Sequence, residues 1–197
     1  MMEEELIKIW QSSPNQERIK FEKSRLIIEM QGSIDRLHRA IKYRDMREYI
    51  AIAIVIPAFA FTAITIPFLL TRIASVLTIL WAIYIAVKLR NAKKKKPGAL
   101  TESYLHYLKK TRDYLIIQKQ MLDSVLYWYI LPGMTLTMMF VLGFGVADRI
   151  KSIVKFALLN VVLAVATYYL NKRAVKAEIT PRLKKIEELI NLLENPN

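Results

Sequence analysis

The side chains that usually carry catalysis are few in this chain and lie far apart. The two histidines, His38 and His106, have no second histidine and no carboxylate cluster at the spacing that binds a metal ion. The sequence contains no nucleophile elbow, no glycine-rich phosphate loop, and no cysteine for a disulfide, a thiolate or a lipid. We therefore expect no catalytic residues, no cofactor and no metal, and a protein that is not an enzyme.

The N-terminal segment carries a pattern that is typical of protein binding. Leu6, Ile9 and Trp10 form a short apolar edge among charged residues, ahead of a helix break at residues 12–14. Such an edge resembles a helix that docks in the groove of a partner, and Trp is a frequent hot-spot residue. We predict that these three residues bind a partner protein. The alternative is that Trp10 packs on the protein's own helices or enters the membrane interface.

A polybasic run follows the second apolar run of the chain, and consists of Lys93, Lys94, Lys95 and Lys96. Attraction of such a run to anionic lipid contributes around 1 kcal/mol per charge near the surface. We predict that these lysines bind lipid headgroups of the anionic inner leaflet. Direct binding of nucleic acid is not expected, because no aromatic residues that could stack on bases are interleaved with the lysines.

The apolar residues, 54% of the 197 residues, are gathered in blocks although the net charge is +13. Four runs contain no charged residue: 49–71, 73–87, 124–147 and 156–171. A bilayer core takes about 20 apolar helical residues, and the shorter runs approach this length if Lys88 and Lys155 snorkel. We predict an all-α polytopic membrane protein with four transmembrane helices. The polar residues 1–48 do not resemble a cleavable signal peptide.

The predicted spans contain no Asp, Glu or His, which are the residues that proton-coupled carriers place at mid-membrane. Asn160 is a notable polar side chain within them. We predict that it forms an interhelical hydrogen bond, with a place on a solute path as the alternative. Gly143, in the third span, is expected to allow close packing or a kink. These features disfavour transport.

The lysines and arginines predict the orientation of the chain. Residues 1–48 and 88–123 each carry ten of the 30, and residues 172–197 carry six. Four spans place these three segments on one side of the membrane, and cytoplasmic loops carry the excess of Lys and Arg. We predict a membrane protein with both termini and the middle segment cytoplasmic, whose short outer connections lie around Arg72 and between Asp148 and Lys155.

The two halves of the predicted membrane region resemble each other. Pro57 corresponds to Pro132, and the Arg72 segment corresponds to the Arg149 segment. We predict two helix-hairpin repeats of the same orientation. The alternative is that any two transmembrane hairpins look alike. The prolines, including Pro67, are expected to kink their helices.

Amphipathic helices are predicted outside the spans. A helix starts near residues 13–16 and continues into the first span, a second one follows Pro97-Gly98 and leads without a break into Trp128, and Thr180-Pro181 restarts a third. Their apolar stripes are too narrow for stability in isolation. We predict that they form a cytoplasmic bundle or stalk. Packing between subunits would satisfy the same pattern, so we also expect a homo-oligomer.

These patterns divide the chain into five segments: a cytoplasmic helical segment (1–48), transmembrane hairpin 1 (49–90), a basic linker with a cytoplasmic helix (91–123), transmembrane hairpin 2 (124–171) and a cytoplasmic C-terminal helix (172–197).

Three short motifs carry a resemblance to a known family. Residues 6–11 (LIKIWQ), residues 43–48 (YRDMRE) and residues 125–129 (VLYWY) resemble an uncharacterised bacterial membrane-protein family encoded beside extracytoplasmic-function sigma factors. The resemblance implies a membrane-tethered, anti-sigma-like regulator whose N-terminal segment contacts a sigma factor. Four predicted spans and very short outer connections differ from the usual single-span anti-sigma pattern.

The resulting functional hypothesis is a non-enzymatic inner-membrane regulator or scaffold that tethers a cytoplasmic protein, such as a sigma factor, through residues 1–48. The alternative is an oligomeric membrane pore or stress effector. Its partners would be anionic membrane lipid, the cytoplasmic protein and other copies of the chain.

Overall fold

The computed structural model describes residues 15–97, 104–144 and 150–194, with side chains from residue 28 onward. The chain divides into two compact units, Met1–Ala40 and Ile41–Asn197. Within the described ranges the protein is helical and contains no strand, which confirms the all-α prediction. The helical elements are α2 (Asn15–Thr65), α3 (Leu69–Lys94), α4 (Tyr104–Asp123), η1 (Leu126–Ile130), α5 (Leu131–Gly143), α6 (Ile150–Ala174), η3 (Val175–Ile179) and α7 (Thr180–Glu194).

Four of the described helical stretches are long and apolar enough to cross a bilayer, as predicted. They are Ile28–Thr65, Leu69–Lys94, Leu126–Gly143 and Lys151–Glu194. The polar helix that precedes the first span passes into it without a break, because α2 is one helix that includes both Gly32 and Pro57. The amphipathic helix ahead of the first span therefore extends that span.

The first connection lies earlier than predicted. Helix α2 ends at Thr65, and residues 66–68 join it to α3. Pro67 lies in this connection and kinks no helix, and Arg72 lies in the first turn of α3. The connection was predicted at Arg72 because this is the charged residue between the first two apolar runs. The helix instead breaks at Pro67, because proline has no N–H donor and disfavours helical backbone at the residue before it.

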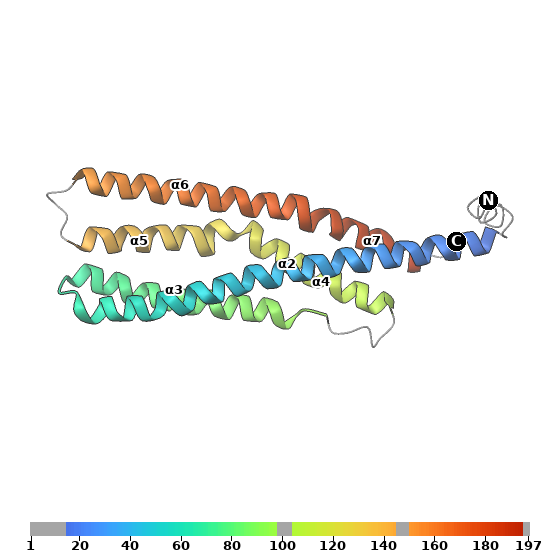
Figure 1. Ribbon diagram of the computed structural model, residues 1–197, viewed down its shortest axis with the longest axis horizontal. Helices are drawn as coiled ribbons and strands as arrows, with labels where there is room; N and C mark the ends of the chain where they lie inside the picture. The colour runs from blue at the N-terminus through green and yellow to red at the C-terminus, as the bar shows by residue number, and fades with distance from the viewer. Residues whose placement is uncertain (1–14, 98–103, 145–149, 195–197) are drawn as a thin grey trace, which may run out of the picture. The chain divides into compact units, whose positions relative to one another are not determined.

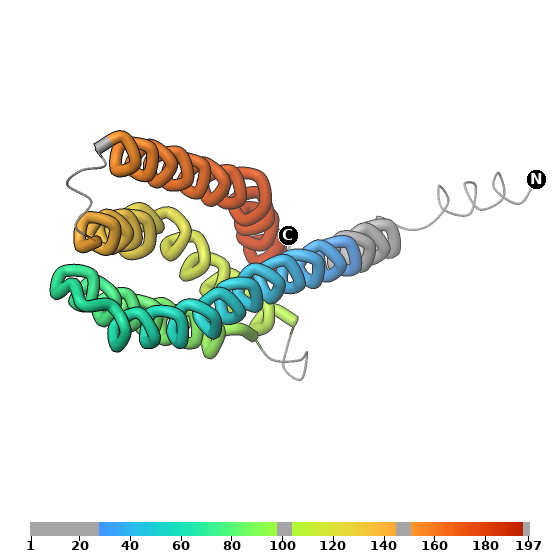
Figure 2. The backbone as a smooth tube through the Cα atoms, turned by 60° about the vertical axis from the view of Figure 1, so that its left-hand side comes forward, coloured from blue at the N-terminus to red at the C-terminus, as the bar shows by residue number. Residues whose placement is uncertain are grey.

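The second unit is built on contacts of α5 with α3 on one side and with α6 on the other (Figures 1 and 2). The C-terminal part of α2 joins this group through Phe59, whose ring lies edge-on to Phe140 of α5 at 5.2 Å between centroids. It also contacts α3, where Thr62 Oγ1 lies 3.1 Å from Ser75 Oγ. Away from these spans α4 packs against η3 and α7.

Two glycines allow α3 and α5 to approach closely. A Cβ atom on Gly143 would lie 2.3 Å from Thr71 Oγ1 and 2.4 Å from the Thr71 backbone nitrogen. A Cβ atom on Gly133 would lie 3.0 Å from the Trp81 ring. Gly143 ends α5. Its backbone lies close to that of Thr71 in α3. The third span was predicted to continue to residue 147, so α5 ends earlier than expected.

Two π-helical turns lie just before prolines, one where the sequence predicted a kink at Pro132 and one where it predicted a helix restart at Thr180. The Leu131 N–H bonds to the Leu126 carbonyl and the Thr180 N–H bonds to the Val175 carbonyl, so each bond spans five residues. Each wide turn ends two residues before a proline, Pro132 or Pro181. A proline ring clashes with the carbonyl four residues earlier in a regular α-helix, and a π turn moves that carbonyl away. The third helix therefore does not restart at Thr180 but continues α6.

The junction of α4 with the third span also differs from the prediction of an unbroken helix. Helix α4 ends at Asp123. The Ser124 hydroxyl donates to the Gln120 carbonyl at 2.7 Å and lies 3.3 Å from the Met121 carbonyl. These local bonds satisfy backbone carbonyls at the point where the chain changes from α-helix to the π turn.

Candidate functional site

The residues predicted from the sequence fall in different parts of the structure. Leu6, Ile9 and Trp10 lie outside the described residues. Lys93 and Lys94 form the basic last turn of α3, and Lys95 and Lys96 follow it directly. Asn160 lies in α6, and its Nδ2 donates to the Met134 carbonyl of α5 at 3.3 Å. The structure thus brings Asn160 to an interhelical contact and places the lysine run at the end of a span.

A polar cluster that sequence reasoning missed joins α2 to α4. Arg44 Nη2 donates to Gln118 Oε1 at 2.9 Å, and the same guanidinium pairs with Asp45 at 2.7 Å. Gln118 is fully buried, and Asp45 is buried with only 7% of its surface exposed. A buried carboxylate requires a paired charge, and here the neighbouring arginine supplies it.

The sequence contained a signal for this cluster. Leu108, Leu115 and Leu122 are buried along one stripe of α4, and Gln118 falls on that stripe between the last two. A polar residue at a seam position costs stability unless it has a partner, so it indicates a specific contact. The partner, Arg44, is 74 residues away and could not be identified by spacing.

Tyr114 belongs to the same cluster. Burial is the main cause that raises the pKa of its phenol to about 12, and the negative charge of Asp45 adds to it, while Arg44 and a hydrogen bond with Gln118 act in the opposite direction. The phenol therefore remains neutral and cannot serve as a base at physiological pH.

A second polar contact lies one turn further along α2. The Tyr129 hydroxyl of η1 donates to Glu48 Oε2 at 3.2 Å. The Tyr129 ring lies 5.5 Å from the rings of Trp81 and Trp128, measured between centroids. Aromatic rings with polar groups are typical of the membrane interface, so this end of the spans has the composition expected there.

Trp81 and Lys88 extend the aromatic cluster onto α3. Trp81 Nε1 donates to the Trp128 carbonyl at 3.3 Å, and the Lys88 ammonium lies 4.2 Å from the centroid of the Trp128 ring. The cation–π contact gives Lys88 a partner near the end of its span.

The polar side chains between α2, α4 and η1 are arranged to hold these helices together rather than to act on a substrate. Arg44, Asp45, Gln118 and Glu48 are paired with one another or with Tyr129. Among the residues that the structure describes, no group of His, Cys, Asp or Glu could hold a metal ion. The cluster can fix α2 against α4 and η1, because a hydrogen bond to a charged group contributes about 1.5–3 kcal/mol.

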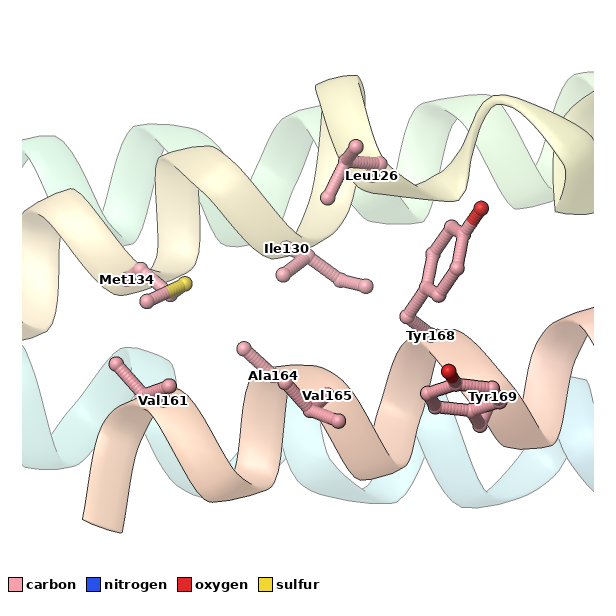
Figure 3. Close-up of a pocket in the computed structure, with 8 residues that line it drawn as sticks. All are labelled: Leu126, Ile130, Met134, Val161, Ala164, Val165, Tyr168 and Tyr169. Atoms are coloured by element: carbon pink, nitrogen blue, oxygen red, sulfur yellow. The ribbon is translucent and has the colours of Figure 1, made fainter. Parts of the chain in front are cut away.

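A separate apolar groove of about 260 Å³ lies between the third span and α6 (Figure 3). It is lined by Leu126, Ile130, Met134, Val161, Ala164, Val165, Tyr168 and Tyr169. No protein-family model, curated protein or solved structure matches this chain.

Proposed function

We propose that the protein is a non-enzymatic regulator or scaffold of the bacterial inner membrane that tethers a cytoplasmic protein through its N-terminal segment. The observation that carries this proposal is the bond from Arg44 of α2 to the buried Gln118 of α4 at 2.9 Å. It fixes to the bundle the helix that follows the predicted binding residues Leu6, Ile9 and Trp10.

The continuity of α2 supports a regulatory role. This helix includes Asn15 at one end and the first apolar span at the other. A helical backbone is hydrogen-bonded throughout, so a displacement of the span at the Glu48–Tyr129 contact would be passed to the preceding turns of the helix. Binding of a partner through residues 1–48 would in this way respond to the packing of the spans.

The distribution of charge supports a cytoplasmic location for both termini and for the α3–α4 connection. Lys93, Lys94, Lys95 and Lys96 lie at the end of α3, where anionic headgroups would attract them. In this proposal the membrane holds the partner, of which an anti-sigma-like target is the leading candidate, away from its site of action. Other copies of the chain are proposed neighbours in the membrane.

The proposal is tested by crosslinking in native membranes followed by affinity capture. We compare the full chain with Trp10→Ala and use Lys8→Ala, a polar neighbour in the same segment, as the matched control. We expect the full chain and the control to capture the same soluble protein, and Trp10→Ala to lose it. Equal capture by all three forms would exclude Trp10 as the contact, and capture of the chain alone by the wild type would overturn the tethering role.

A further inference from the structure

The groove between the third span and α6 has walls that come from two helices. Ile130 and Met134 face Val161, Ala164 and Val165 across it (Figure 3). All these side chains are apolar, and the groove has a volume of about 260 Å³. Water would find almost no hydrogen-bond partner there, so an apolar molecule suits the space better.

One end of the groove is polar and cationic. Tyr168 lines this end, and the Lys172 ammonium lies 5.9 Å from the centroid of its ring. Lys172 also pairs with Asp123 at 3.0 Å. An ammonium group has three donors, so this pairing still allows Lys172 to bind a phosphate oxygen. Arg173 is exposed beside it and adds positive charge.

The surroundings of the groove match the interior of a bilayer. Between residues 151 and 170, α6 has no buried side chain, and its outward residues include Leu158 (64% exposed) and Leu163 (57% exposed). A surface of this kind on a helix long enough to span a membrane is solvated by lipid chains. The groove opens onto the same helix, so lipid has direct access to it.

We propose that the groove binds one acyl chain of a bilayer phospholipid, whose phosphate group is held by Lys172. The acyl chain fills the space between Ile130 and Ala164, where an empty void would lose dispersion contacts. The phosphate lies at the level of Tyr168, at the polar end. The apolar walls and the cationic end together match an amphiphile with an anionic phosphate.

The test uses the purified full chain in nanodiscs that contain phosphatidylglycerol, a fraction of which carries a photoreactive diazirine on its acyl chain. After illumination, the labelled residues are mapped by mass spectrometry. We expect label to concentrate on the groove residues Ile130, Met134 and Ala164 relative to Leu163, which lies on the opposite face of α6. Equal labelling of both faces would show ordinary annular lipid and would overturn the proposal.

Substitutions that fill the groove provide the second arm. Ala164→Trp is expected to reduce labelling of Ile130 by about tenfold, which corresponds to about 1.4 kcal/mol of binding free energy. Leu163→Trp introduces the same side chain outside the groove and should leave labelling unchanged. Met134→Trp fills the groove from the other wall, so a folded variant remains available if one of the two does not fold. Unchanged labelling in the filled variants, or crosslinks at Ala164 to a second copy of the chain, would overturn the proposal.

The phosphate contact is tested with a diazirine-labelled diacylglycerol, which has the chains without the phosphate. We expect the wild type to label more with phosphatidylglycerol than with diacylglycerol, and Lys172→Gln to lose this preference. A preference that survives Lys172→Gln would show that another group binds the phosphate and would overturn that part of the proposal.

Discussion

Trp81 and Trp128 are joined by a hydrogen bond at the carbonyl that lies four residues before Pro132. Trp81 Nε1 donates to the Trp128 carbonyl at 3.3 Å. That carbonyl lies four residues before Pro132, which has no N–H to offer it. The Trp81 indole donates to this carbonyl from α3, and its ring lies beside Gly133.

This bond predicts that the effects of Trp81→Phe and Pro132→Ala on the free energy of unfolding are not additive. Trp81→Phe should lower the free energy of unfolding by about 1–3 kcal/mol because a partly buried carbonyl loses its indole donor and packing is reduced. Pro132→Ala restores a backbone N–H to the helix, so the same Trp81→Phe change should cost less in that background. A double-mutant cycle measured by unfolding in detergent gives the coupling between the two sites. Additive effects would contradict this account of the bond.

The close contact of Gly143 with Thr71 predicts that Gly143→Ala destabilises the α3–α5 pair. The added methyl group would lie 2.4 Å from the Thr71 backbone nitrogen, so one of the two helices must shift. Overpacking of this kind typically costs about 1–3 kcal/mol. Gly32→Ala is the control, because nothing lies within 4 Å of the added atom, and it should raise stability by about 0.5–1 kcal/mol. The two melting temperatures should therefore change in opposite directions.

The buried polar cluster predicts that Arg44→Met costs much more than the loss of an exposed arginine. The variant leaves the Asp45 carboxylate, which is 7% exposed, without the charge that pairs with it. Removing one partner of a buried ion pair typically costs about 3–5 kcal/mol, and the partial exposure of Arg44 places the expected loss at about 3 kcal/mol. Arg47→Met, on the exposed face of the same helix, should change the unfolding free energy little. Equal effects of the two variants would mean that the cluster does not stabilise the fold.

The raised pKa of Tyr114 predicts that the protein loses stability at high pH. Its phenol has a folded-state pKa of about 12, raised first by burial and then by Asp45. The unfolded chain releases this proton near pH 10, while the folded chain retains it, so the stabilisation is complete below pH 10 and is lost as the pH rises towards 12. Unfolding measured between pH 8 and pH 12 should show this decrease, and Tyr114→Phe should make it shallower. A decrease of the same steepness in Tyr114→Phe would assign it to other groups.

The predicted orientation is tested by single cysteines, because the natural chain has none. A cysteine at Lys95 should react with a membrane-impermeant maleimide only in inverted vesicles, because cytoplasmic segments carry the lysine excess. A cysteine at Phe68, in the α2–α3 connection, should react only in intact spheroplasts. Reaction of both positions from the same side would exclude the proposed crossing of α3.

The polar contacts of the candidate site join residues that are far apart in the sequence. Asn160 was notable because an amide among apolar residues needs a partner, although the Met134 carbonyl could not be identified in advance. The Arg44–Gln118 bond was missed for the same reason, since its partners lie on different helices. Trp10 lies outside the described residues, so its role stays a prediction.

The helical class and the four apolar helices could be predicted from the sequence, because periodicity and the absence of charge are local properties of the chain. Where the helices end and change pitch depends on tertiary contacts. Pro67 lies in a connection, while Pro132 and Pro181 follow π turns, and the same residue type thus has different effects. Beside Pro132 the helix continues as α5, and the Trp81 indole of α3 donates to the Trp128 carbonyl four residues before that proline, a contact between helices that local sequence does not reveal.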